Sequence, residues 1–357
     1  MRSILLVFLV TTIVTTSPPA QTTEGAAWIL LYHHVSNTTP EATSITPEMF
    51  DEHLDFLARN EYRVVSLSEV VTRLVSDELD SRSVAITFDD AYKSVYTQAF
   101  PRLRERRWPF TIFVNTDAVD RKSNAYVSWA QLREMEQAGG SIGNHSRSHA
   151  HLAAHRANES SEQWRARVSA DIVHARQRLA AELEQPLALF AYPYGEFTPE
   201  LTALVRSLGY RAFGQQSGPL GWGVAELAIP RIPLAHGFAD LASLSEKLRT
   251  RHLPVRVLQP ASPVLQPNAA APTLELQIAT GPFDLSQLAC YVSNQGRAKL
   301  NWRADEPRVV QVKATRALPV GRSKYTCTAP ATNAPGVYYW YSHLWLQPQP
   351  DGSWYDG

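Results

Sequence analysis

Two adjacent carboxylates and a pair of histidines are the residues of this chain best suited to chemistry. The carboxylates close the stretch Thr-Phe-Asp-Asp at residues 87–90, which follows an apolar run at 84–86 that is typical of a buried strand. Neighbouring carboxylates at a strand end are costly unless a cation or a substrate uses them. His145 and His149 are four residues apart, and on a helical turn this spacing puts both imidazoles on one face, where they can bind one metal ion. One Asp and two His leave a coordination position open to water, so the pattern predicts a metal-dependent hydrolase.

The elements that must position these residues form a strand–helix alternation from about residue 27 to residue 255. Helix starts are marked by Thr46, which is followed by a proline, and by Ser128 with Gln131 three residues later, the pattern of a capping box. Repeated alternation of this kind predicts a parallel α/β sheet or barrel. The carboxylates, the histidines and residues 192–194 all follow predicted strands, and chemistry gathers at the carboxyl ends of strands in such folds. We therefore expect them to lie on one side of the domain.

The composition and the hydrophobic pattern of the chain change after residue 255. Residues 256–272 are rich in proline and are predicted to form a linker, and the alternating pattern of residues 273–357 predicts an all-β module. Cys290 and Cys327 are the two cysteines of the sequence, and an even pair in an exported protein predicts a disulfide.

The cysteines have aromatic neighbours that are typical of a particular β fold. Trp302 lies between the two cysteines, and Tyr325 precedes the second one by two residues. This arrangement resembles the immunoglobulin-type sandwich, so we expect a small β-sandwich with that character.

Composition and the N-terminus bear on location. The 357 residues include 34 basic and 34 acidic side chains, so no overall field favours nucleic acid or an anionic membrane. A basic Arg2, an apolar run at 4–14 and small residues up to Ala20 predict a signal peptide over residues 1–20. No later stretch is long and apolar enough to span a bilayer, so we expect an exported protein, periplasmic or secreted, without a membrane span in the mature chain.

Three motifs, in this order along the chain, resemble those of the NodB-type polysaccharide deacetylases, carbohydrate esterase family four. They are Thr-Phe-Asp-Asp at 87–90, His-Ser-x-x-His at 145–149 and Tyr-Pro-Tyr-Gly at 192–195. The resemblance covers about residues 27–255 and implies a distorted (β/α) barrel for that domain.

Two further stretches narrow the resemblance within the family. Residues 31–35 and 190–196 are most similar to the exported deacetylases of poly-β-1,6-N-acetyl-D-glucosamine, which belong to biofilm exopolysaccharide systems. The resemblance thus implies a hydrolase of linear amides (carbon–nitrogen bonds other than peptide bonds). It also implies a polysaccharide substrate and exopolysaccharide secretion machinery as a candidate partner.

The resemblance also implies a role for each motif residue. Asp89 matches the general base that takes a proton from water, and Asp90, His145 and His149 match the metal ligands. The backbone N–H near Tyr194 matches the donor to the oxyanion of the tetrahedral intermediate. The implied cofactor is a divalent metal, with zinc as the default for this donor set and nickel, cobalt and iron as alternatives.

Several positions depart from the family pattern or leave alternatives open. Many members carry an arginine that steadies the catalytic aspartate where this chain has Ala191, and Arg231 either contacts substrate or pairs with an acidic residue. His236, in a Leu-x-His stretch, matches the family's general acid, and His151 competes with His149 as a ligand. The family's remaining aspartate motif is not placed, with Asp240 as one option.

Two side chains are predicted to contact the glycan directly. His33 and His34 end the first predicted strand, and we take His34 as the one that lines the groove. Trp222 lies between glycines and offers a ring for stacking on a sugar, although core packing explains such a residue equally well. The alternatives to poly-β-1,6-GlcNAc deacetylation are deacetylation of peptidoglycan, chitin or another glycan, and carbohydrate binding without catalysis.

Overall fold

The central strands of the first domain are buried on both faces. In the computed structural model, which describes residues 25–356, β1 (Ala27–Tyr32) and β5 (Ser83–Asp89) are buried along their whole lengths. They pair in parallel over six residues, from Ala27 opposite Ser83 to Tyr32 opposite Phe88. Continuous apolar runs are typical of parallel strands that are covered by helices on both sides. The alternation in the sequence therefore identified the class of this domain correctly.

The sheet of the first domain curves toward a barrel. Its order is β10-β1-β5-β6-β7-β8-β9, β4 pairs with β5 beside this path, and all of its pairings are parallel. The other strands are β4 (Arg63–Val64), β6 (Phe110–Val114), β7 (Gly140–Asn144), β8 (Leu189–Ala191), β9 (Arg211–Phe213) and β10 (Ile232–Pro233). Ile229 bridges to Phe213 on β9, and Ile232 pairs with Leu30 on β1. Residues 229–233 thus connect the two edges of the sheet.

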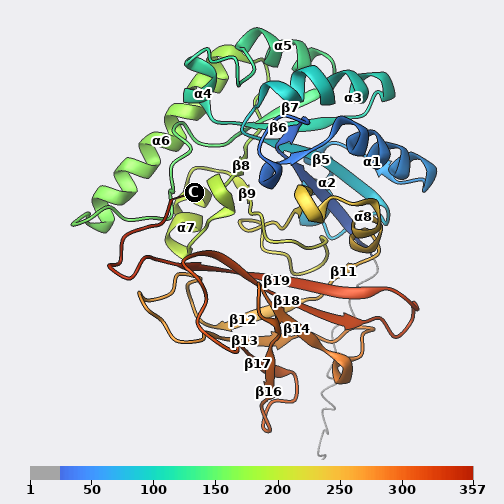
Figure 1. Cartoon of the computed structure of the whole chain (residues 1–357), viewed down its shortest axis with the longest axis vertical. Coiled ribbons are helices and arrows are strands. Elements are labelled where there is room, and N and C mark those ends of the chain that lie inside the picture. The colour runs from blue at the N-terminus through green and yellow to red at the C-terminus, as the bar shows by residue number, and fades with distance from the viewer. Residues whose placement is uncertain (1–24, 357) are drawn as a thin grey trace, which may run out of the picture.

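Helices cover this sheet (Figure 1). They are α1 (Pro47–Arg59), α2 (Leu67–Val75), α3 (Phe100–Arg106), α4 (Thr116–Asp120), α5 (Trp129–Gln137), α6 (Ser161–Glu182), α7 (Pro199–Ser207) and α8 (Leu241–Lys247). The predicted caps are confirmed: Thr46 Oγ1 accepts a hydrogen bond from Met49 N–H, and Ser128 and Gln131 form the capping box. The helical segment that follows β5 begins as the π-helical turn η2 (Val95–Ala99) and continues as α3.

Short elements join the barrel strands. They are β2 (His34–Val35), η1 (Glu41–Thr43), β3 (Ser44–Ile45), η3 (Pro193–Gly195) and η4 (His236–Phe238). We call residues 25–250 the barrel domain.

The rest of the chain, residues 251–356, forms an all-β domain of two sheets, which we call the β domain. One sheet has the order β11-β19-β18-β14-β15 and the other β12-β13-β17-β16. The strands are β11 (Arg251–His252), β12 (Val255–Gln259), β13 (Thr273–Ile278), β14 (Ala289–Val292), β15 (Gly296–Arg297), β16 (Lys299–Trp302), β17 (Val309–Lys313), β18 (Gly321–Pro330) and β19 (Tyr338–Gln347), with the short helix η5 (Leu285–Gln287). Leu274 and Leu276 of one sheet and Tyr325 and Trp345 of the other share one core. The predicted β-sandwich therefore exists.

The immunoglobulin-like character expected of the β domain is not confirmed. Cys290 and Cys327 form the predicted disulfide, but they lie directly opposite each other on the neighbouring strands β14 and β18 of one sheet. In the immunoglobulin fold the disulfide connects the two sheets and a buried Trp packs on it. Here Trp302 lies on β16 and keeps 36% of its surface exposed, whereas Trp345 is the tryptophan buried in the core. Residue types and spacing alone could not say which strands would be neighbours.

The structure draws the domain boundary earlier than the sequence predicted. Residues 255–259, within or next to the predicted linker, form β12, which pairs antiparallel with β13. Leu253 is fully buried in the β-domain core, and Leu265 N–H donates to Leu346 O on β19. The proline-rich composition hid these contacts because pairing partners more than ten residues away leave no local signal. The predicted signal peptide, residues 1–20, lies outside the described residues.

Within residues 25–356, no helix combines the length and the apolar character needed to cross a membrane.

Candidate metal-dependent active site

Three loops at the carboxyl edge of the sheet meet at the candidate site. Asp90 directly follows β5, residues 145–149 follow β7, and residues 192–195 follow β8. Because β5, β6, β7 and β8 are consecutive neighbours in a parallel sheet, their carboxyl ends lie along one edge. The convergence expected from the sequence is therefore the result of the strand order.

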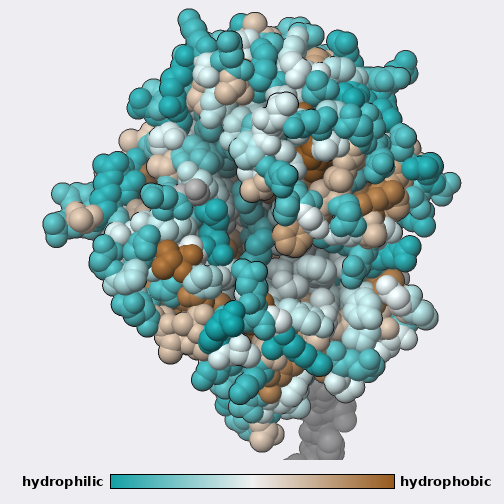
Figure 2. Space-filling view, in the orientation of Figure 1, coloured by the Kyte–Doolittle hydropathy of each residue, from teal (hydrophilic) through white to brown (hydrophobic). Residues whose placement is uncertain are grey.

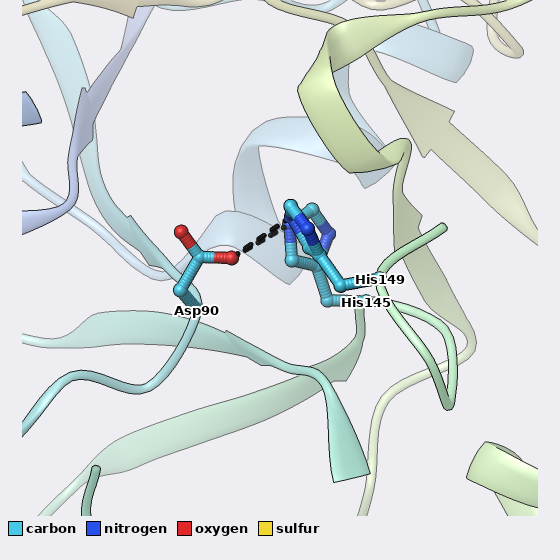
Figure 3. A group of neighbouring side chains, drawn as sticks. All are labelled: Asp90, His145 and His149. Atoms are coloured by element: carbon cyan, nitrogen blue, oxygen red, sulfur yellow. Dashed lines mark ion pairs between the residues drawn. The ribbon is translucent and has the colours of Figure 1, made fainter. Parts of the chain in front are cut away.

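Asp90, His145 and His149 form a compact group (Figure 3). Asp90 Oδ1 lies 3.0 Å from His149 Nε2 and 3.4 Å from His145 Nε2. One ligand atom from each residue lies within 4.8 Å of the others, and Asp90 and His145 are buried. A carboxylate and two imidazole nitrogens are a donor set that divalent transition metals prefer, so these residues fit a metal ion.

Neighbouring groups fix the orientation of these side chains. His145 Nδ1 lies 2.7 Å from Ala191 O, and since a carbonyl only accepts, this nitrogen carries the proton and Nε2 is left with its lone pair. Asn115 Nδ2 donates to Asp90 Oδ1 over 3.4 Å, while the buried Asn115 Oδ1 has no hydrogen-bond partner in the described chain. Ala191 thus contributes its backbone carbonyl to the site.

The electrostatics favour a charged Asp90. Burial by itself would raise the pKa of Asp90, but the neighbouring imidazoles of His145 and His149 outweigh this effect and hold the pKa well below its usual value. For His145, burial would lower the pKa, and the neighbouring Asp89 and Asp90 raise it instead. The carboxylate is therefore present as the anion that a cation requires.

The two histidines are not on a helical turn, contrary to the interpretation of their spacing. Residues 145–149 form a loop in which Ser146 and His149 have left-handed backbones, with φ of 68° and 57°. Ser146 N–H donates to Asn144 Oδ1, and His149 N–H donates to Ser146 Oγ. These side-chain caps, rather than helical periodicity, turn His149 toward His145. Strained backbone of this kind is concentrated at functional sites.

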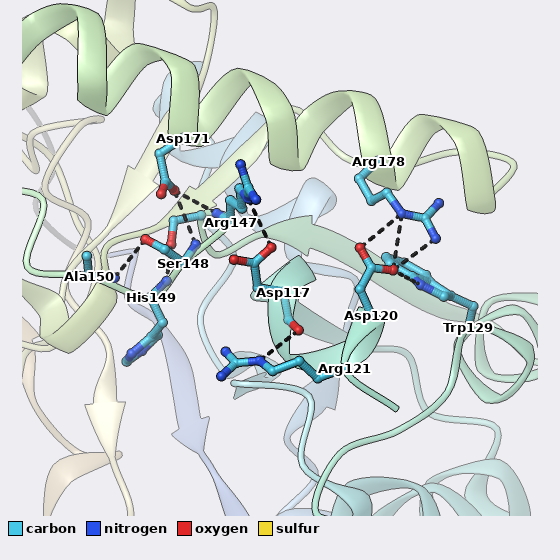
Figure 4. A network of polar contacts seen from close by, with 11 residues as sticks. Asp117, Asp120, Arg121, Trp129, Arg147, Ser148, His149, Ala150, Asp171 and Arg178 are labelled. Atoms are coloured by element: carbon cyan, nitrogen blue, oxygen red, sulfur yellow. Dashed lines mark hydrogen bonds and ion pairs between the residues drawn. The ribbon is translucent and has the colours of Figure 1, made fainter. Parts of the chain in front are cut away.

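A polar network behind the loop holds it in place (Figure 4). Asp171 on α6 accepts hydrogen bonds from the backbone N–H groups of Arg147 and Ser148, over 2.7 and 3.4 Å. Arg147 in turn donates to Asp117 on α4 over 3.0 Å. The two helices therefore position the loop that presents His149.

Asp89 lies in a buried ion pair with Arg231. Arg231 Nη1 and Nη2 donate to Asp89 Oδ1 and Oδ2 over 2.8 and 2.7 Å, and neither residue has any exposed surface. Arg231 Nε donates to Gly214 O over 2.9 Å, which fixes the guanidinium plane. Of the two roles left open for Arg231, the structure shows pairing with an acidic residue.

This pair keeps Asp89 ionised. Burial would raise the pKa of Asp89, but Arg231 and His145 more than offset it, so the pKa lies below its usual value. The two-pronged contact uses about two of the four lone-pair positions of the carboxylate, so Asp89 retains the capacity to accept a proton. An arginine from residues 229–233 thus supplies the support that Ala191 cannot give.

Tyr194 lies against two histidines, one of which, His149, is a candidate metal ligand. Its ring stacks on His151 with 4.0 Å between centroids, and the His149 ring is 4.6 Å away. Tyr194 has a left-handed backbone, with φ of 59°, and Gly195 N–H and Glu196 N–H donate the hydrogen bonds that close the turn. The N–H of Tyr194 itself, the predicted oxyanion donor, takes part in neither of these two hydrogen bonds.

His151 is held away from the ligand position. Its Nδ1 lies 2.8 Å from Glu196 Oε2, and the group of ligand atoms contains His149 instead. Between the two candidates for the second histidine, the structure brings His149 to Asp90.

The first strand brings two histidines toward the site. His34 is buried and stacks on Tyr92 with 3.6 Å between ring centroids. Burial raises the pKa of Tyr92, and a hydrogen bond with Asp90 raises it further, so the His34–Tyr92 stack lies beside the carboxylate. Burial lowers the pKa of His33, which also interacts electrostatically with Asp90 and Asp89. His33 and Tyr92 are thus site residues that were not selected from the sequence, although His33 is next to His34 and Tyr92 is two residues from Asp90.

Two other predicted residues are not brought to this group. His236 begins η4 with 64% of its side chain exposed, and its Nδ1 lies 3.4 Å from Glu41 Oε2. Trp222 follows Leu220, whose N–H donates to Ala27 O at the amino end of β1. The metal-binding group lies at the opposite, carboxyl edge of the sheet. Asp240, the option for the unplaced motif, caps α8.

The β domain reaches the site through a buried carboxylate, Glu196. Glu196 is 1% exposed and accepts hydrogen bonds from His151 (2.8 Å), Tyr355 Oη (2.8 Å), Arg322 Nη1 (3.1 Å) and Trp354 Nε1 (3.2 Å). The Arg322 guanidinium also lies 5.2 Å from the centre of the Tyr194 ring. Sequence reasoning missed this carboxylate, although it directly follows the Tyr-Pro-Tyr-Gly stretch, because its partners in the β domain are over a hundred residues away.

Comparison with known proteins finds relatives of the barrel domain. Residues 76–213 match the family described as polysaccharide deacetylase. A poly-β-1,6-N-acetyl-D-glucosamine N-deacetylase of Escherichia coli (strain K12) is 25% identical over 229 residues, covering 54% of this chain and 34% of that protein. This chain therefore spans about a third of the length of that curated relative. An N-deacetylase of the same description from Staphylococcus aureus (strain MRSA252) is 22% identical over 172 residues, covering 47% of this chain and 59% of that protein.

Solved structures show the same likeness. IcaB from Ammonifex degensii matches with a TM-score of 0.56 and 25% identity, covering 64% of this chain and 99% of that one. The deacetylase PplD of Streptococcus pyogenes, in complex with acetate, has a TM-score of 0.56 and 24% identity, covering 62% of this chain and 98% of that one. The latter likeness supports the fold.

The Asp89–Arg231 pair leads to a prediction about stability. Arg231→Leu leaves the Asp89 carboxylate buried and unpaired, so we expect the free energy of unfolding to fall by about 3–5 kcal/mol. The double variant Asp89→Asn/Arg231→Leu removes both charges and should lose less than the sum of the single changes. Urea denaturation measures all three, and Arg303→Leu, from the exposed pair with Asp305, should change stability by about 1 kcal/mol or less. Additive losses at Asp89 and Arg231 would contradict this account.

Glu196 leads to a prediction about pH. Burial would raise the pKa of Glu196, but His151, Tyr355 and Arg322 outweigh it and lower the pKa. Its contribution to stability is therefore fully present above the unfolded-state pKa of about 4.3 and is lost as the pH falls through the lower folded value. We expect Glu196→Gln to cost about 1.5–3 kcal/mol at pH 7. The difference from the unsubstituted protein should shrink on acidification.

Chemical denaturation at a series of pH values measures this difference. Glu200→Gln is the matched control, since Glu200 is exposed and pairs with His155 at the surface. A loss of stability that does not vary with pH would show that the charge of Glu196 is not what holds the two domains together.

Proposed function

We propose that this chain, which carries a polysaccharide deacetylase domain related to the poly-β-1,6-N-acetyl-D-glucosamine N-deacetylases, removes N-acetyl groups from such a glycan. The observation that carries the proposal is the placement of Asp89, ionised by Arg231, next to the group of Asp90, His145 and His149. A buried base beside a three-ligand metal site is an arrangement that can hydrolyse an unactivated amide.

Each residue of the site has a chemical role in this proposal. Asp90, His145 and His149 would hold a divalent metal, for which zinc is the first choice; such an ion would supply Lewis-acid chemistry at the acetamide carbonyl and at the attacking water. Asp89 accepts the proton of the attacking water. The Tyr194 N–H donates to the oxygen on which negative charge develops. His145 Nδ1, held by Ala191 O, keeps the imidazole from rotating away.

The names of the relatives support the choice of substrate and setting. The relatives in E. coli and S. aureus are named as poly-β-1,6-N-acetyl-D-glucosamine N-deacetylases, and one of the similar solved structures is named IcaB. We therefore propose poly-β-1,6-GlcNAc as the substrate, maturation of biofilm exopolysaccharide as the setting and the exported, periplasmic or secreted compartment as the location. Exopolysaccharide secretion machinery is the proposed partner. Peptidoglycan and chitin are the competing substrates, because loops around the metal rather than the metal itself select the glycan.

Acetate release tests the proposal and the role of Asp89 together. We expect acetate from β-1,6-linked GlcNAc oligomers, loss of release on treatment with a chelator, and recovery when zinc is added back. Asp89→Asn should lower kcat by about 10²–10⁴-fold because it removes the general base, while metal content and glycan binding stay unchanged.

Matched oligomers decide between the readings. Release only from β-1,4-linked chitin oligomers or peptidoglycan fragments would reassign the substrate. Glycan binding without acetate release in any metal-loaded sample would show a carbohydrate-binding protein. Unchanged turnover in Asp89→Asn would show that Asp89 is not the general base.

Two histidines are candidates for the general acid that gives a proton to the leaving amine. The sequence proposed His236, which lies against Glu41, whereas His33 is the one of these two histidines that interacts electrostatically with Asp90 and Asp89. We expect His33→Ala to lower kcat by about 10²-fold or more, as the loss of a general acid does, and His236→Ala to lower it much less. Steady-state kinetics with saturating metal measures both variants. The reverse order would assign the acid to His236.

A further inference from the structure

A cleft lies where the two domains meet. It has a volume of about 910 Å³, within the range of about 300–1,000 Å³ that ligand pockets span. Its walls combine the end of the barrel domain, including Phe238 and Lys247, with the β18 and β19 sheet of the β domain. Figure 2 shows the surface hollowed toward the centre of this face, where the two domains meet, with pale colours of intermediate hydropathy along the lower side.

Exposed aromatic rings converge on this cleft. Phe238, Tyr291 and Tyr338 all line it, and their exposed fractions are 68%, 47% and 46%. They account for three of the seven large hydrophobic side chains that stay exposed among the described residues. A flat ring left open to water inside a cleft offers its face to the C–H side of a sugar ring, so several such rings together favour a chain of sugars.

The cleft carries a net positive charge, because Lys247, Lys324 and Arg249 line it against one carboxylate, that of Glu246. Lys247 Nζ donates to Phe238 O over 2.7 Å, and Lys324 Nζ donates to Gln215 O over 3.1 Å. Neither ammonium group makes an ion pair with a carboxylate in the part of the chain that the structure describes. Burial lowers the pKa of both lysines to about 8, so both are mainly charged at neutral pH, and Arg249 adds a third cation.

The cleft continues from the candidate active site. Every second residue of β18 points to the same face, and this face carries Arg322, Lys324 and Thr326. Each of these residues is about 7 Å along the strand from the next. Arg322 lies over the Tyr194 ring, whereas Lys324 and Thr326 line the cleft. Gln215, the acceptor of Lys324, packs so closely on Gly195 that a Cβ at that position would lie 2.5 Å from it. The wall of the cleft thus begins at the loop that carries Tyr194.

We propose that this interdomain cleft binds the N-acetylated glycan chain next to the catalytic site and discriminates against the deacetylated chain. The inference rests on the proposed function, whose substrate it specifies further. N-acetylated sugars are neutral, stack on the aromatic rings and offer carbonyl acceptors to the ammonium groups. Each acetyl group removed leaves an amine that is positively charged near neutral pH, and Lys247 and Lys324 repel it. The cleft therefore retains substrate segments and releases product segments.

Binding to the metal-free full-length protein tests the inference without turnover. Calorimetry compares fully N-acetylated hexamers, β-1,6- or β-1,4-linked, with the same hexamers after chemical deacetylation, and circular dichroism checks that each variant is folded. We expect tighter binding of the acetylated hexamers. The double variant Tyr291→Ala/Tyr338→Ala should weaken it by about tenfold or more. The matched control Trp302→Ala removes an exposed ring of the same domain that lies outside the cleft, and it should bind normally.

The charge and the chain length supply two further readouts. Lys324→Met should narrow the difference in affinity between acetylated and deacetylated hexamers. In the metal-loaded enzyme, the aromatic double variant should raise KM for the hexamer and leave kcat and the KM for a GlcNAc dimer unchanged.

The two proposals can fail separately. The proposal for the cleft would be wrong if the double variant and the unsubstituted protein bound the hexamers with equal affinity. It would also be wrong if the unsubstituted protein bound acetylated and deacetylated chains equally well. Hexamer binding that depends on Tyr291 and Tyr338, without any acetate release, would support glycan binding in the cleft and refute the proposed deacetylase activity.

Discussion

The ion pair between Asp89 and Arg231 is the interaction on which the rest of the site depends. Both side chains are fully buried, so neither charge can be placed without the other. Arg231 belongs to residues 229–233, which connect β9 to β1, and Asp89 ends β5. The contact that orients the proposed base is therefore also a contact across the barrel. A fold that failed to bring these edges together would leave a buried charge without a partner.

The candidate metal-binding group depends on backbone geometry as much as on residue type. Asp90, Ser146, His149 and Tyr194 all have left-handed backbones, and each lies in a loop at the carboxyl edge of the sheet. Such conformations cost about 1–3 kcal/mol each, so they persist only where surrounding contacts determine them. Side-chain caps from Asn144 and Asp171 and the carbonyl of Ala191 provide these contacts. The rigid helices and strands thus hold the ligands at positions that the loops would not adopt alone.

The β domain is part of the same arrangement. Its Arg322 and its C-terminal residues Trp354 and Tyr355 surround Glu196, one residue from the Tyr-Pro-Tyr-Gly turn. The same face of β18 then continues into the cleft between the domains. Because a buried carboxylate must keep its donors, separation of the two domains would expose or unpair Glu196. The two domains are therefore coupled at the loop that presents Tyr194.

The sequence by itself determined the parts of this protein that local patterns encode. Strand–helix alternation predicted the parallel sheet, capping residues marked helix starts such as Thr46 and Ser128, and the motif order indicated the family and the candidate ligands. It did not determine which distant groups meet. The role of Arg231, the burial of Glu196, the positions of His33 and Trp222, the strand β12 within a proline-rich stretch and the in-sheet disulfide all depend on contacts between residues far apart in the chain. Local propensity carries no information about such partners, because they are selected by the packing of the whole fold.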